Sequence, residues 1–484
     1  MGYYAIGIGG TGAKCLESLI HLAAAGMMPD GDLHLLFVDP DLANGSRARA
    51  GETLANYVKC EDQLKLGKTH LLKTKIIPAD PILWTPFDTT NPSLKQFFHY
   101  ESFRDSPAGK LFDVLYSKAE KESTLEEGFR GHPSIGSAVM AKTVNLKANP
   151  TWSQLRAKIA ADDEGAKVFL AGSIFGGTGA SGFPTIAQIV KDELDVKLGG
   201  ALLLPYFKFM DDGDEDKLKA KSDEFLMNTQ TALKHYHLWG KTGVYDAVYL
   251  FGDESRTDVE NALGGSEQKN APHFIELYAA LAAVDFFRFG GDFGPDGSVQ
   301  YFMTARQDNN CLKWTDLPDG NNGDTVRPRI GQMARFAFAY LSVYHPALQK
   351  IANRSKDAYR APWFVDFFER RNLSINQALL GTVEKYCNDF LLWLANIQGN
   401  CSDMETIELI EYSAYAERKA DGSLALKSPE NFSNDLSHLI RDQAEAESIV
   451  LDELWERMCN SRRKGRDAQD IGKFLRALYE NCGE

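Results

Sequence analysis

The apolar positions of the chain fall into two patterns, which indicate strands and helices in alternation. Short apolar runs are typical of buried strands, whereas apolar residues repeated every three or four positions are typical of helices. The short runs cover residues 3–8, 34–38, 167–171, 200–207 and 245–251. Stretches of helical period follow several of them. Strands that alternate with helices predict an α/β fold with a doubly wound parallel sheet.

The longest apolar stretch of helical period begins at Asn270 and predicts a core helix over about residues 270–289. After about residue 310 nearly all of the sequence has helical period, so we expect a mostly α-helical C-terminal domain over residues 311–484, after an α/β domain over residues 1–310. Residues 40–130 are polar and contain several prolines, a composition that predicts irregular structure without a long element.

Size and charge narrow the classes of function. A chain of 484 residues exceeds what one hydrophobic core usually supports, which agrees with two domains. The net charge of -14 disfavours nucleic acid as a direct partner. The seven cysteines form no CxxC pair and have no zinc-site spacing, as is typical of reduced thiols. No apolar run reaches the roughly 20 residues of a membrane span. We therefore expect a cytoplasmic protein.

Two glycine-rich loops lie between an apolar run and a stretch of helical period. The first is GIGGTG at residues 7–12, and the second is FGGTGASG at residues 175–182. Glycines let successive backbone N–H groups converge on one point, and the N-terminus of the following helix adds partial positive charge. Each loop therefore predicts an anion cradle. In the second loop, Thr178 and Ser181 would add hydroxyl donors.

The first loop by itself leaves more than one ligand open. Gly7, Gly9 and Gly12 satisfy the GxGxxG fingerprint of dinucleotide-binding folds, and Asp39 ends the next apolar run, where such folds bind a ribose. Asp39 lies farther along the chain than usual, but a nicotinamide or flavin oxidoreductase remains one interpretation. A Walker P-loop fits less well, because one residue separates Gly12 from Lys14 and GK[ST] is absent.

Taken in order, the loops resemble those of the tubulin and FtsZ superfamily of GTP-binding proteins. Residues 168–193 are similar to the family's signature loop with its flanking strand and helix, and residues 7–12 are similar to its N-terminal phosphate loop. FVDPD at residues 37–41 resembles the family's second-strand segment. GHPSIG at residues 131–136 resembles its GxNPxxG loop, with His132 in place of Asn. The resemblance covers roughly residues 1–300. It disfavours an oxidoreductase, because a dinucleotide-binding fold needs no second glycine loop such as the one at residues 175–182.

The resemblance implies a site for GTP or GDP, with Mg²⁺ at the phosphates and no residue assigned as a metal ligand. The implied nucleotide-binding residues are Gly9, Gly10, Thr11, Gly12, Asp39, Asp41, Gly131, His132, Pro133, Gly176, Gly177, Thr178, Gly179, Ala180, Ser181, Gly182, Asp253 and Asn270. Asp253 and Asn270 stand where the family holds the guanine base. Their side-chain oxygens would accept hydrogen bonds from guanine N1–H and its exocyclic amine, so the resemblance favours GTP over ATP.

The resemblance also implies where hydrolysis takes place. In the family, a loop at the end of the core helix of one subunit is inserted against the nucleotide of the next. GGDFGPD at residues 290–296 lies at the corresponding distance, with Asp292 and Asp296 as the candidate catalytic acids. Gly290 replaces the family's Asn, and Pro295 changes the turn. A bacterial tubulin-like protein of this kind would associate head to tail and hydrolyse GTP between subunits.

The C-terminal part departs from the family, in which a mixed domain with a β-sheet follows the core helix. A helical domain over residues 311–484 is suited to docking another protein. This departure supports a second hypothesis, a regulatory or scaffold protein that binds a nucleotide, does not polymerise and reports its nucleotide state to a partner, for example in a bacterial system such as phage defence.

Overall fold

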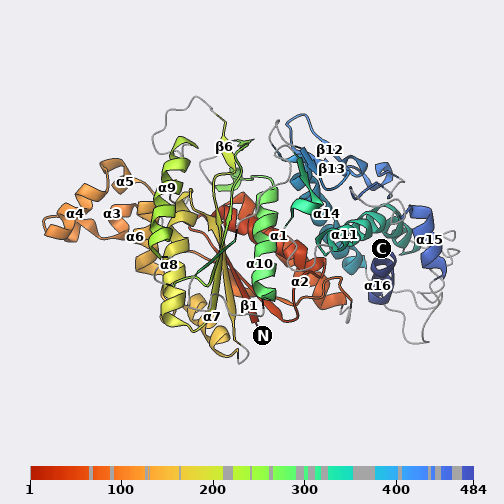
Figure 1. Ribbon diagram of the computed structural model, residues 1–484, viewed down its shortest axis with the longest axis horizontal. Helices are drawn as coiled ribbons and strands as arrows, with labels where there is room; N and C mark the ends of the chain where they lie inside the picture. The colour runs from red at the N-terminus through yellow and green to blue at the C-terminus, as the bar shows by residue number, and fades with distance from the viewer. Residues whose placement is uncertain are drawn as a thin grey trace.

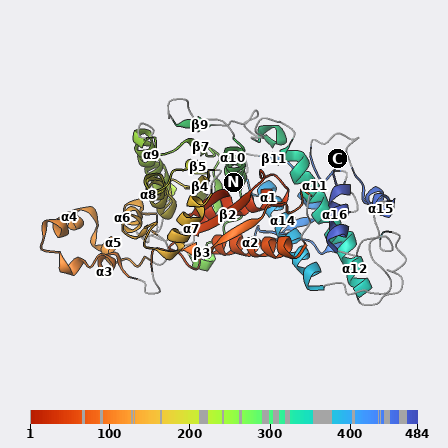
Figure 2. The ribbon, with the colours of Figure 1, turned by 90° about the horizontal axis from the view of Figure 1, so that it is seen from below.

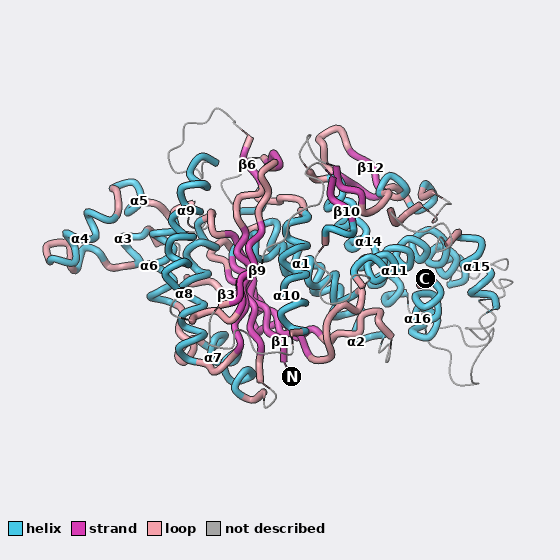
Figure 3. The backbone as a smooth tube through the Cα atoms, in the orientation of Figure 1, coloured by secondary structure: helices cyan, strands magenta, loops and turns pink. Residues whose placement is uncertain are grey.

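The computed structural model describes residues 2–64, 69–87, 92–125, 129, 131–162, 165–210, 222–239, 243–260, 265–289, 299–302, 311–317, 325–352, 363, 377–401, 406–433, 436, 438–441, 449–460 and 471–483. Within them, strands and helices alternate up to the end of the core helix, and helices predominate after it (Figure 3). The predicted α/β class and the mostly helical C-terminal part are therefore confirmed.

A seven-stranded sheet forms the centre of the molecule (Figure 1). From edge to edge, its strands are β3 (Ile76–Trp84), β2 (Asp32–Val38), β1 (Gly2–Ile8), β4 (Lys167–Ser173), β5 (Lys197–Leu203), β7 (Ala247–Phe251) and β9 (Gln300–Phe302). All of these strands pair in parallel. The strand order reverses between β1 and β4, and a reversal of this kind is where doubly wound sheets bind ligands.

Helices cover both faces of the sheet, which Figure 2 shows edge-on. On one face lie α1 (Gly9–Ala24), α2 (Gly45–Leu64) and α10 (Phe274–Arg288), and on the other lie α6 (Pro133–Thr143), α7 (Pro150–Ala160) and α8 (Gly177–Glu193). Successive residues of a strand therefore pack into hydrophobic cores on opposite faces of the sheet. Tyr3 packs on the side of α1, and Tyr4 packs on the side of α8. Burial on both faces explains why the strands are continuously apolar in the sequence.

The helix α2 corrects the expectation of irregular structure over residues 40–130. It is 20 residues long, and its buried apolar residues, among them Leu54, Tyr57 and Leu64, form a narrow stripe between polar ones. The prolines do not interrupt it. Pro78 and Pro81 lie in β3, which is an edge strand and tolerates residues without an N–H group.

The remaining elements of the N-terminal part are shorter or peripheral. Helices α3 (Leu94–Phe97), α4 (Pro107–Leu115) and α5 (Lys118–Glu122) form an arm at one end of the molecule (Figure 1), and α9 (Ser222–Trp239) lies beside α8. The predicted strand over residues 200–207 is divided in two. β5 ends at Leu203, and Phe207 begins β6 (Phe207–Phe209), which pairs with β8 (Thr257–Val259) in a separate small sheet.

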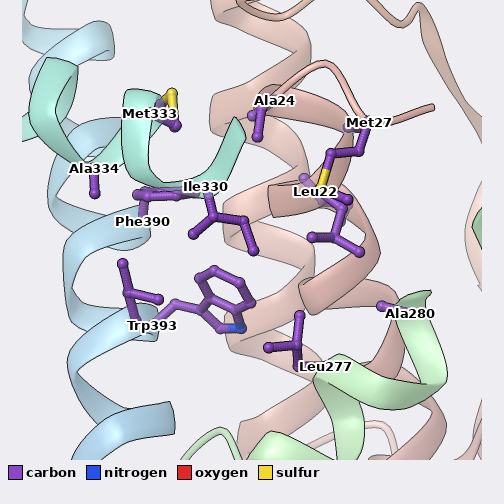
Figure 4. Close-up of a cluster of buried hydrophobic side chains, with 14 of the residues drawn as sticks. Leu22, Ala24, Met27, Leu277, Ala280, Ile330, Met333, Ala334, Phe390 and Trp393 are labelled. Atoms are coloured by element: carbon purple, nitrogen blue, oxygen red, sulfur yellow. The ribbon is translucent and has the colours of Figure 1, made fainter. Parts of the chain in front are cut away.

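The C-terminal half shares a hydrophobic core with the sheet region. Figure 4 shows Phe390 and Trp393 of α14 (Gln377–Gly399) and Ile330 of α11 (Val326–Ala339) beside Leu22 of α1. The boundary near residue 310 stays a prediction. The other C-terminal elements are α12 (His345–Ala352), α15 (Leu451–Asn460), α16 (Ile471–Asn481), β10 (Cys311–Lys313), β11 (Thr406–Glu408), β12 (Ala416–Arg418) and β13 (Leu424–Leu426). Among the described helices, none has the length and apolar character needed to cross a membrane.

The helix α1 is buried along almost its whole length, because the sheet, α2, α10 and α14 surround it. Four polar side chains of α1 are therefore buried as well: Lys14, Glu17, Ser18 and His21. Buried polar groups lower stability unless they find hydrogen-bond partners. The partners of these side chains connect α1 to its neighbours.

Candidate functional site

Three parallel strands end side by side where the strand order reverses. Ile8 of β1 pairs with Val38 of β2 and with Gly172 of β4. The next residues, Gly9 after β1 and Asp39 after β2, therefore emerge at one edge of the sheet, together with the loop that follows β4. The structure thus brings together the two predicted glycine loops and two of the predicted nucleotide-binding acids, Asp39 and Asp41.

The first predicted loop, Gly9, Gly10, Thr11 and Gly12, is the first turn of α1. Gly9 has a φ of 72°, and a Cβ atom at this position would lie 3.2 Å from the Cβ atom of Thr178 in the second loop. The two loops are therefore in contact at a position that favours glycine. The N-cap residue of α1, Ile8, makes no side-chain capping hydrogen bond, so an anion can pair with the first N–H groups of this helix.

The second loop, residues 176–182, contains the N-cap and the first turns of α8. Gly176 is the N-cap and has no side chain to pair with the leading N–H groups. Thr178 and Ala180 are half-buried. Ser181 is fully buried, and its hydroxyl donates to the carbonyl oxygen of Gly177 at 2.7 Å. Ser181 therefore stabilises the turn, and the ligand-donor roles expected of Ser181 and of the half-buried Thr178 stay predictions.

The third loop, Gly131, His132 and Pro133, lies against the second. A Cβ atom at Gly177 would lie 3.0 Å from the backbone nitrogen of Gly131. Pro133 is the first residue of α6, where the missing N–H of proline is no loss. The His132 Nδ1 atom lies 3.6 Å from the Oε1 atom of Glu120 on α5. A His–Glu pair therefore occupies the position where the resemblance has a neutral Asn.

Asn228 of α9 is a site residue that the sequence did not indicate. Its side-chain amide donates to the carbonyl oxygens of Phe175, at 3.1 Å, and Gly131, at 3.3 Å, and so connects the second and third loops. The two partners are 53 and 97 residues away along the chain. A single asparagine on a predicted helix carries no sign of such distant partners.

Asp39 follows β2 and lies at the same edge of the sheet as the glycine loops. It is 3% exposed, and its Oδ1 atom accepts from the backbone nitrogen of Asp41 at 3.1 Å. Its Oδ2 atom is buried and has no hydrogen-bond partner among the described residues. Burial raises the pKa of Asp39 to about 7. The carboxyl group therefore holds an unused acceptor beside the first glycine loop.

Asp41 has a structural role in this arrangement. Its Oδ1 atom accepts from the backbone nitrogen of Ala43 at 2.9 Å, and its Oδ2 atom accepts from that of Gly265 at 2.7 Å. Nearby, the amide of Asn44 donates to the Oε1 atom of Gln268 at 2.8 Å. These bonds fix the segment before α10 against the segment after β2. No sequence pattern links Asn44 with Gln268.

The predicted base-side residues lie after β7 and before α10. Asp253 is buried, and its Oδ1 atom accepts from the backbone nitrogen of Ser255 at 3.1 Å. Asn270 is half-buried and does not begin the core helix, so that expectation was wrong. The helix begins at Phe274, because the side chain of His273 caps it by accepting from a backbone nitrogen of its first turn. The contact of both residues with a base stays a prediction.

Lys14 is directed away from the glycine loop. Its ammonium group forms an ion pair with Glu276 of α10 and donates to the hydroxyl of Tyr206 at 3.3 Å. The side chains of Lys14 and Glu276 are 4% and 0% exposed. Because a P-loop lysine has to reach the phosphates, this geometry agrees with the absence of GK[ST].

The predicted catalytic acids, Asp292 and Asp296, lie outside the described residues, and their role stays a prediction. The helix that precedes them, α10, ends at Arg288. Across the described part of the chain, no group of three or more His, Cys, Asp or Glu side chains is placed to hold a metal ion.

No protein-family model matches the sequence, and no curated protein matches it. Partial likeness is found to solved structures of CetZ proteins of the tubulin/FtsZ family. A GTPγS-bound protofilament of CetZ2 from Haloferax volcanii is 16% identical, with a TM-score of 0.30, and the match covers 59% of each chain. CetZ from Methanosaeta thermophila is 12% identical, with a TM-score of 0.26, and the match covers 58% of this chain and 52% of that one.

The GDP-bound monomer of CetZ1 from Haloferax volcanii is 12% identical to this chain, with a TM-score of 0.28. The match covers 55% of this chain and 56% of that one. In all three comparisons, the matched part is less than two thirds of the length of the CetZ chain.

Proposed function

We propose that the chain binds GTP or GDP, together with Mg²⁺, at the carboxyl edge of its sheet. The observation that carries this proposal is that α1 and α8 begin side by side where the strand order reverses, in contact through Gly9 and Thr178. Neither N-cap residue, Ile8 of α1 or Gly176 of α8, makes a side-chain capping hydrogen bond. Two such N-termini supply converging N–H groups and partial positive charge, which suits a chain of phosphates.

The surrounding residues fit the rest of a guanine nucleotide. The half-buried Thr178 would donate to a phosphate or to a metal-bound oxygen. The free Oδ2 atom of Asp39 would accept from a nucleotide hydroxyl. Asp253 and Asn270 would accept from the donors of guanine, which adenine does not present. Mg²⁺ supplies charge neutralisation at the phosphates.

We also propose that hydrolysis takes place between subunits that associate head to tail. The end of α10 lies at the opposite, amino edge of the sheet, because Lys167 at the start of β4 donates to the carbonyl oxygen of Phe287 at 2.8 Å. Asp292 and Asp296 follow that end of α10. They would therefore reach the nucleotide of a neighbouring subunit rather than the one bound by their own chain, and would orient water there.

The test measures GTP turnover as a function of protein concentration, with sedimentation of the same samples. Specific activity that rises with concentration, alongside pelleting, is expected for a site completed between subunits. Replacing Asp292→Ala should lower turnover by about 100-fold or more and leave GTP binding intact, as expected when a group that orients the attacking water is lost. The matched control, Asp105→Ala, changes a fully exposed acid on the arm and should behave as wild type.

A regulator that does not polymerise is the second candidate. The observation that favours it is that one helix, α1, contacts both the proposed nucleotide site and the C-terminal half of the chain. α1 begins at the proposed nucleotide site, and its Ser18 hydroxyl accepts from the indole nitrogen of Trp393 on α14 at 3.1 Å. Tight GTP or GDP binding with negligible turnover and no pellet would favour this candidate and a partner for the C-terminal half. A flavin or nicotinamide cofactor extracted from the purified protein would overturn both.

A further inference from the structure

The predicted base-side residue Asn270 lies in a short segment that is fixed against the start of α2. We call residues 265–272 the base-side segment. The backbone nitrogen and the hydroxyl of Ser46 both donate to the carbonyl oxygen of Gln268, at 3.0 and 3.2 Å. Together with the bonds of Asp41 and Asn44 described above, they hold the first half of the segment in place.

Arg49 of α2 connects the second half of the base-side segment to α1. Its Nη1 atom donates to the carbonyl oxygen of Asn270 at 3.0 Å. The other edge of the guanidinium faces Glu17 of α1, where the Nε atom donates to Oε1 at 2.8 Å and the Nη2 atom donates to Oε2 at 2.8 Å. One planar group therefore bonds to two residues on different elements, through three nitrogen atoms.

Glu17 prevents the guanidinium of Arg49 from turning. The side chain of Glu17 is 3% exposed, and that of Arg49 is 31% exposed. A buried carboxylate requires a counter-charge, and a two-point contact fixes both the position and the plane of the guanidinium. The Nη1 atom is therefore held toward the carbonyl oxygen of Asn270.

Building on the proposed nucleotide site, we propose that Arg49 is a positioning residue for guanine recognition, which acts by fixing the backbone of Asn270. The side-chain oxygen of Asn270 accepts from guanine only if it lies within hydrogen-bond distance of the base. Its position depends on the backbone that Arg49 holds, and a small displacement removes the contact. The glycine loops bind the phosphates without this bond, so Arg49 affects the choice of base and leaves phosphate binding unchanged.

The variant Arg49→Lys tests this role and keeps a counter-charge for Glu17. A lysine ends in a single nitrogen atom, so it can pair with Glu17 but does not reproduce the separate bond from Nη1 to Asn270. Isothermal titration calorimetry measures the dissociation constants of GTPγS, ATPγS and inorganic tripolyphosphate. The preference for GTPγS over ATPγS should fall by about tenfold, the effect of roughly one hydrogen bond, and the affinity for tripolyphosphate should not change.

The matched control is Arg457→Lys on α15. The Nε and Nη2 atoms of Arg457 donate to the Oε1 atom of Glu453 at 3.2 and 2.7 Å, and its Nη1 atom donates to the carbonyl oxygen of Asn481 at 3.5 Å. It thus bonds to the same two kinds of group in the C-terminal half and should keep the preference of the wild type. If Arg49→Lys does not fold, the double variant Glu17→Leu with Arg49→Met replaces the whole pair with apolar side chains and should show the same loss of preference.

The variant Asn270→Ala shows whether Arg49 acts through Asn270. It removes the side-chain acceptor and keeps the carbonyl oxygen that Arg49 holds. It should lower the preference for GTPγS about as much as Arg49→Lys does. Combining the two changes should cause no further loss, because both remove the same contact with the base.

The outcomes separate the role of Arg49 from the nucleotide site. An unchanged preference in Arg49→Lys, with or without an equal loss of affinity for all three ligands, would overturn the positioning role and leave the site in place. Losses that add in the double variant of Arg49 and Asn270 would also overturn it. If the wild type binds GTPγS and ATPγS equally, the predicted base contacts fail and the positioning role fails with them. If the wild type binds none of the three ligands, the nucleotide site itself fails.

Discussion

The two ends of α1 hold buried polar side chains by different means. Near the glycine loop, Lys14 forms an ion pair with Glu276, and both charges are enclosed by protein. Near the C-terminal half, His21 lies beside Tyr386 of α14, with 3.2 Å between its Nδ1 atom and the tyrosine hydroxyl, among aromatic rings. Burial, together with the charge of Arg49, lowers the pKa of His21 to about 3, so His21 itself is neutral.

This difference affects how each end responds to a lost partner or to a change of pH. A buried charge that loses its counter-charge is strongly destabilising, whereas a neutral hydrogen bond contributes only about 1 kcal/mol. A buried neutral histidine, however, makes its surroundings sensitive to acid. We therefore expect the glycine-loop end to be sensitive to mutation and the α14 end to be sensitive to low pH.

The largest expected effect is that of Glu276→Ala. It leaves the ammonium group of Lys14 buried without a counter-charge, and should lower the free energy of unfolding by about 3–5 kcal/mol. Urea denaturation without ligand measures this loss. The control, Glu267→Ala, removes an exposed carboxylate just before α10 and should cost less than about 0.5 kcal/mol.

The double variant Lys14→Met with Glu276→Leu sharpens the interpretation. Replacing both members of a buried ion pair with apolar side chains is often close to neutral, so the double variant should recover the part of the loss that comes from the unpaired charge. The hydroxyl of Tyr206 and the backbone nitrogen of His273 still lose Glu276 as their acceptor, so the recovery is partial. If the double variant is as unstable as the single one, the unpaired charge is not the cause of the loss.

The second largest expected effect is the loss of folding stability in acid that arises from His21, at the α14 end of α1. The pKa of His21 is lower in the folded protein than in the unfolded chain, so the unfolded chain binds more protons below about pH 6.5. The stability from His21 is thus fully present above that pH and is lost as pH falls toward 3. Between pH 7 and pH 4 the loss is up to about 3 kcal/mol.

The variant His21→Gln isolates this effect, because glutamine is polar but does not titrate. Its deficit in unfolding free energy relative to the wild type should shrink as pH falls from 7 to 4. His237→Gln changes an exposed histidine on α9 and should show the same pH dependence as the wild type. A deficit of His21→Gln that stays constant with pH would mean that His21 is not the acid-sensitive group at this end.

The glycine loops and the strands before them could be predicted because their requirements are local. A strand buried on both faces has to be apolar throughout, and a tight contact such as that of Gly9 with Thr178 favours glycine. Parallel strands end at a common edge, so Asp39 could be placed near the loops as well. The fold class and the phosphate side of the candidate site follow from such local patterns.

The contacts between distant segments could not be predicted. Lys14 and Glu276 occupy different helices, and nothing in the spacing of either sequence segment links them. Asn228 likewise connects two loops that are distant from it along the chain, and no sequence pattern links it with them. The helix α2 was missed because its apolar stripe is narrow, and Asn270 was placed in the core helix because the capping role of His273 has no marked sequence pattern.

A third prediction concerns Asp39, whose pH dependence should be opposite to that of His21. The pKa of Asp39 is raised to about 7 in the folded protein, so the stability from its protonated form is present below about pH 4 and is lost as pH rises through about 7. Without ligand, stability should fall by about 1–2 kcal/mol between pH 6 and pH 8 for this reason. Asp39→Asn should abolish that part of the fall in urea denaturation, whereas Asp105→Asn, at a fully exposed acid, should leave it unchanged.

The smallest expected effect is that of Ser18→Ala, which removes a neutral acceptor at the α14 end. The indole nitrogen of Trp393 then loses its partner, and the free energy of unfolding should fall by about 1 kcal/mol. Ser134→Ala, at an exposed serine of α6, should stay within about 0.5 kcal/mol of the wild type. Ser18 belongs to α1, and Glu276 contacts Lys14 of the same helix. The losses of unfolding free energy in the two variants, measured by urea denaturation, therefore compare the two ends of α1 directly. A loss for Ser18→Ala as large as that for Glu276→Ala would mean that the charge of the ion pair does not distinguish the two ends.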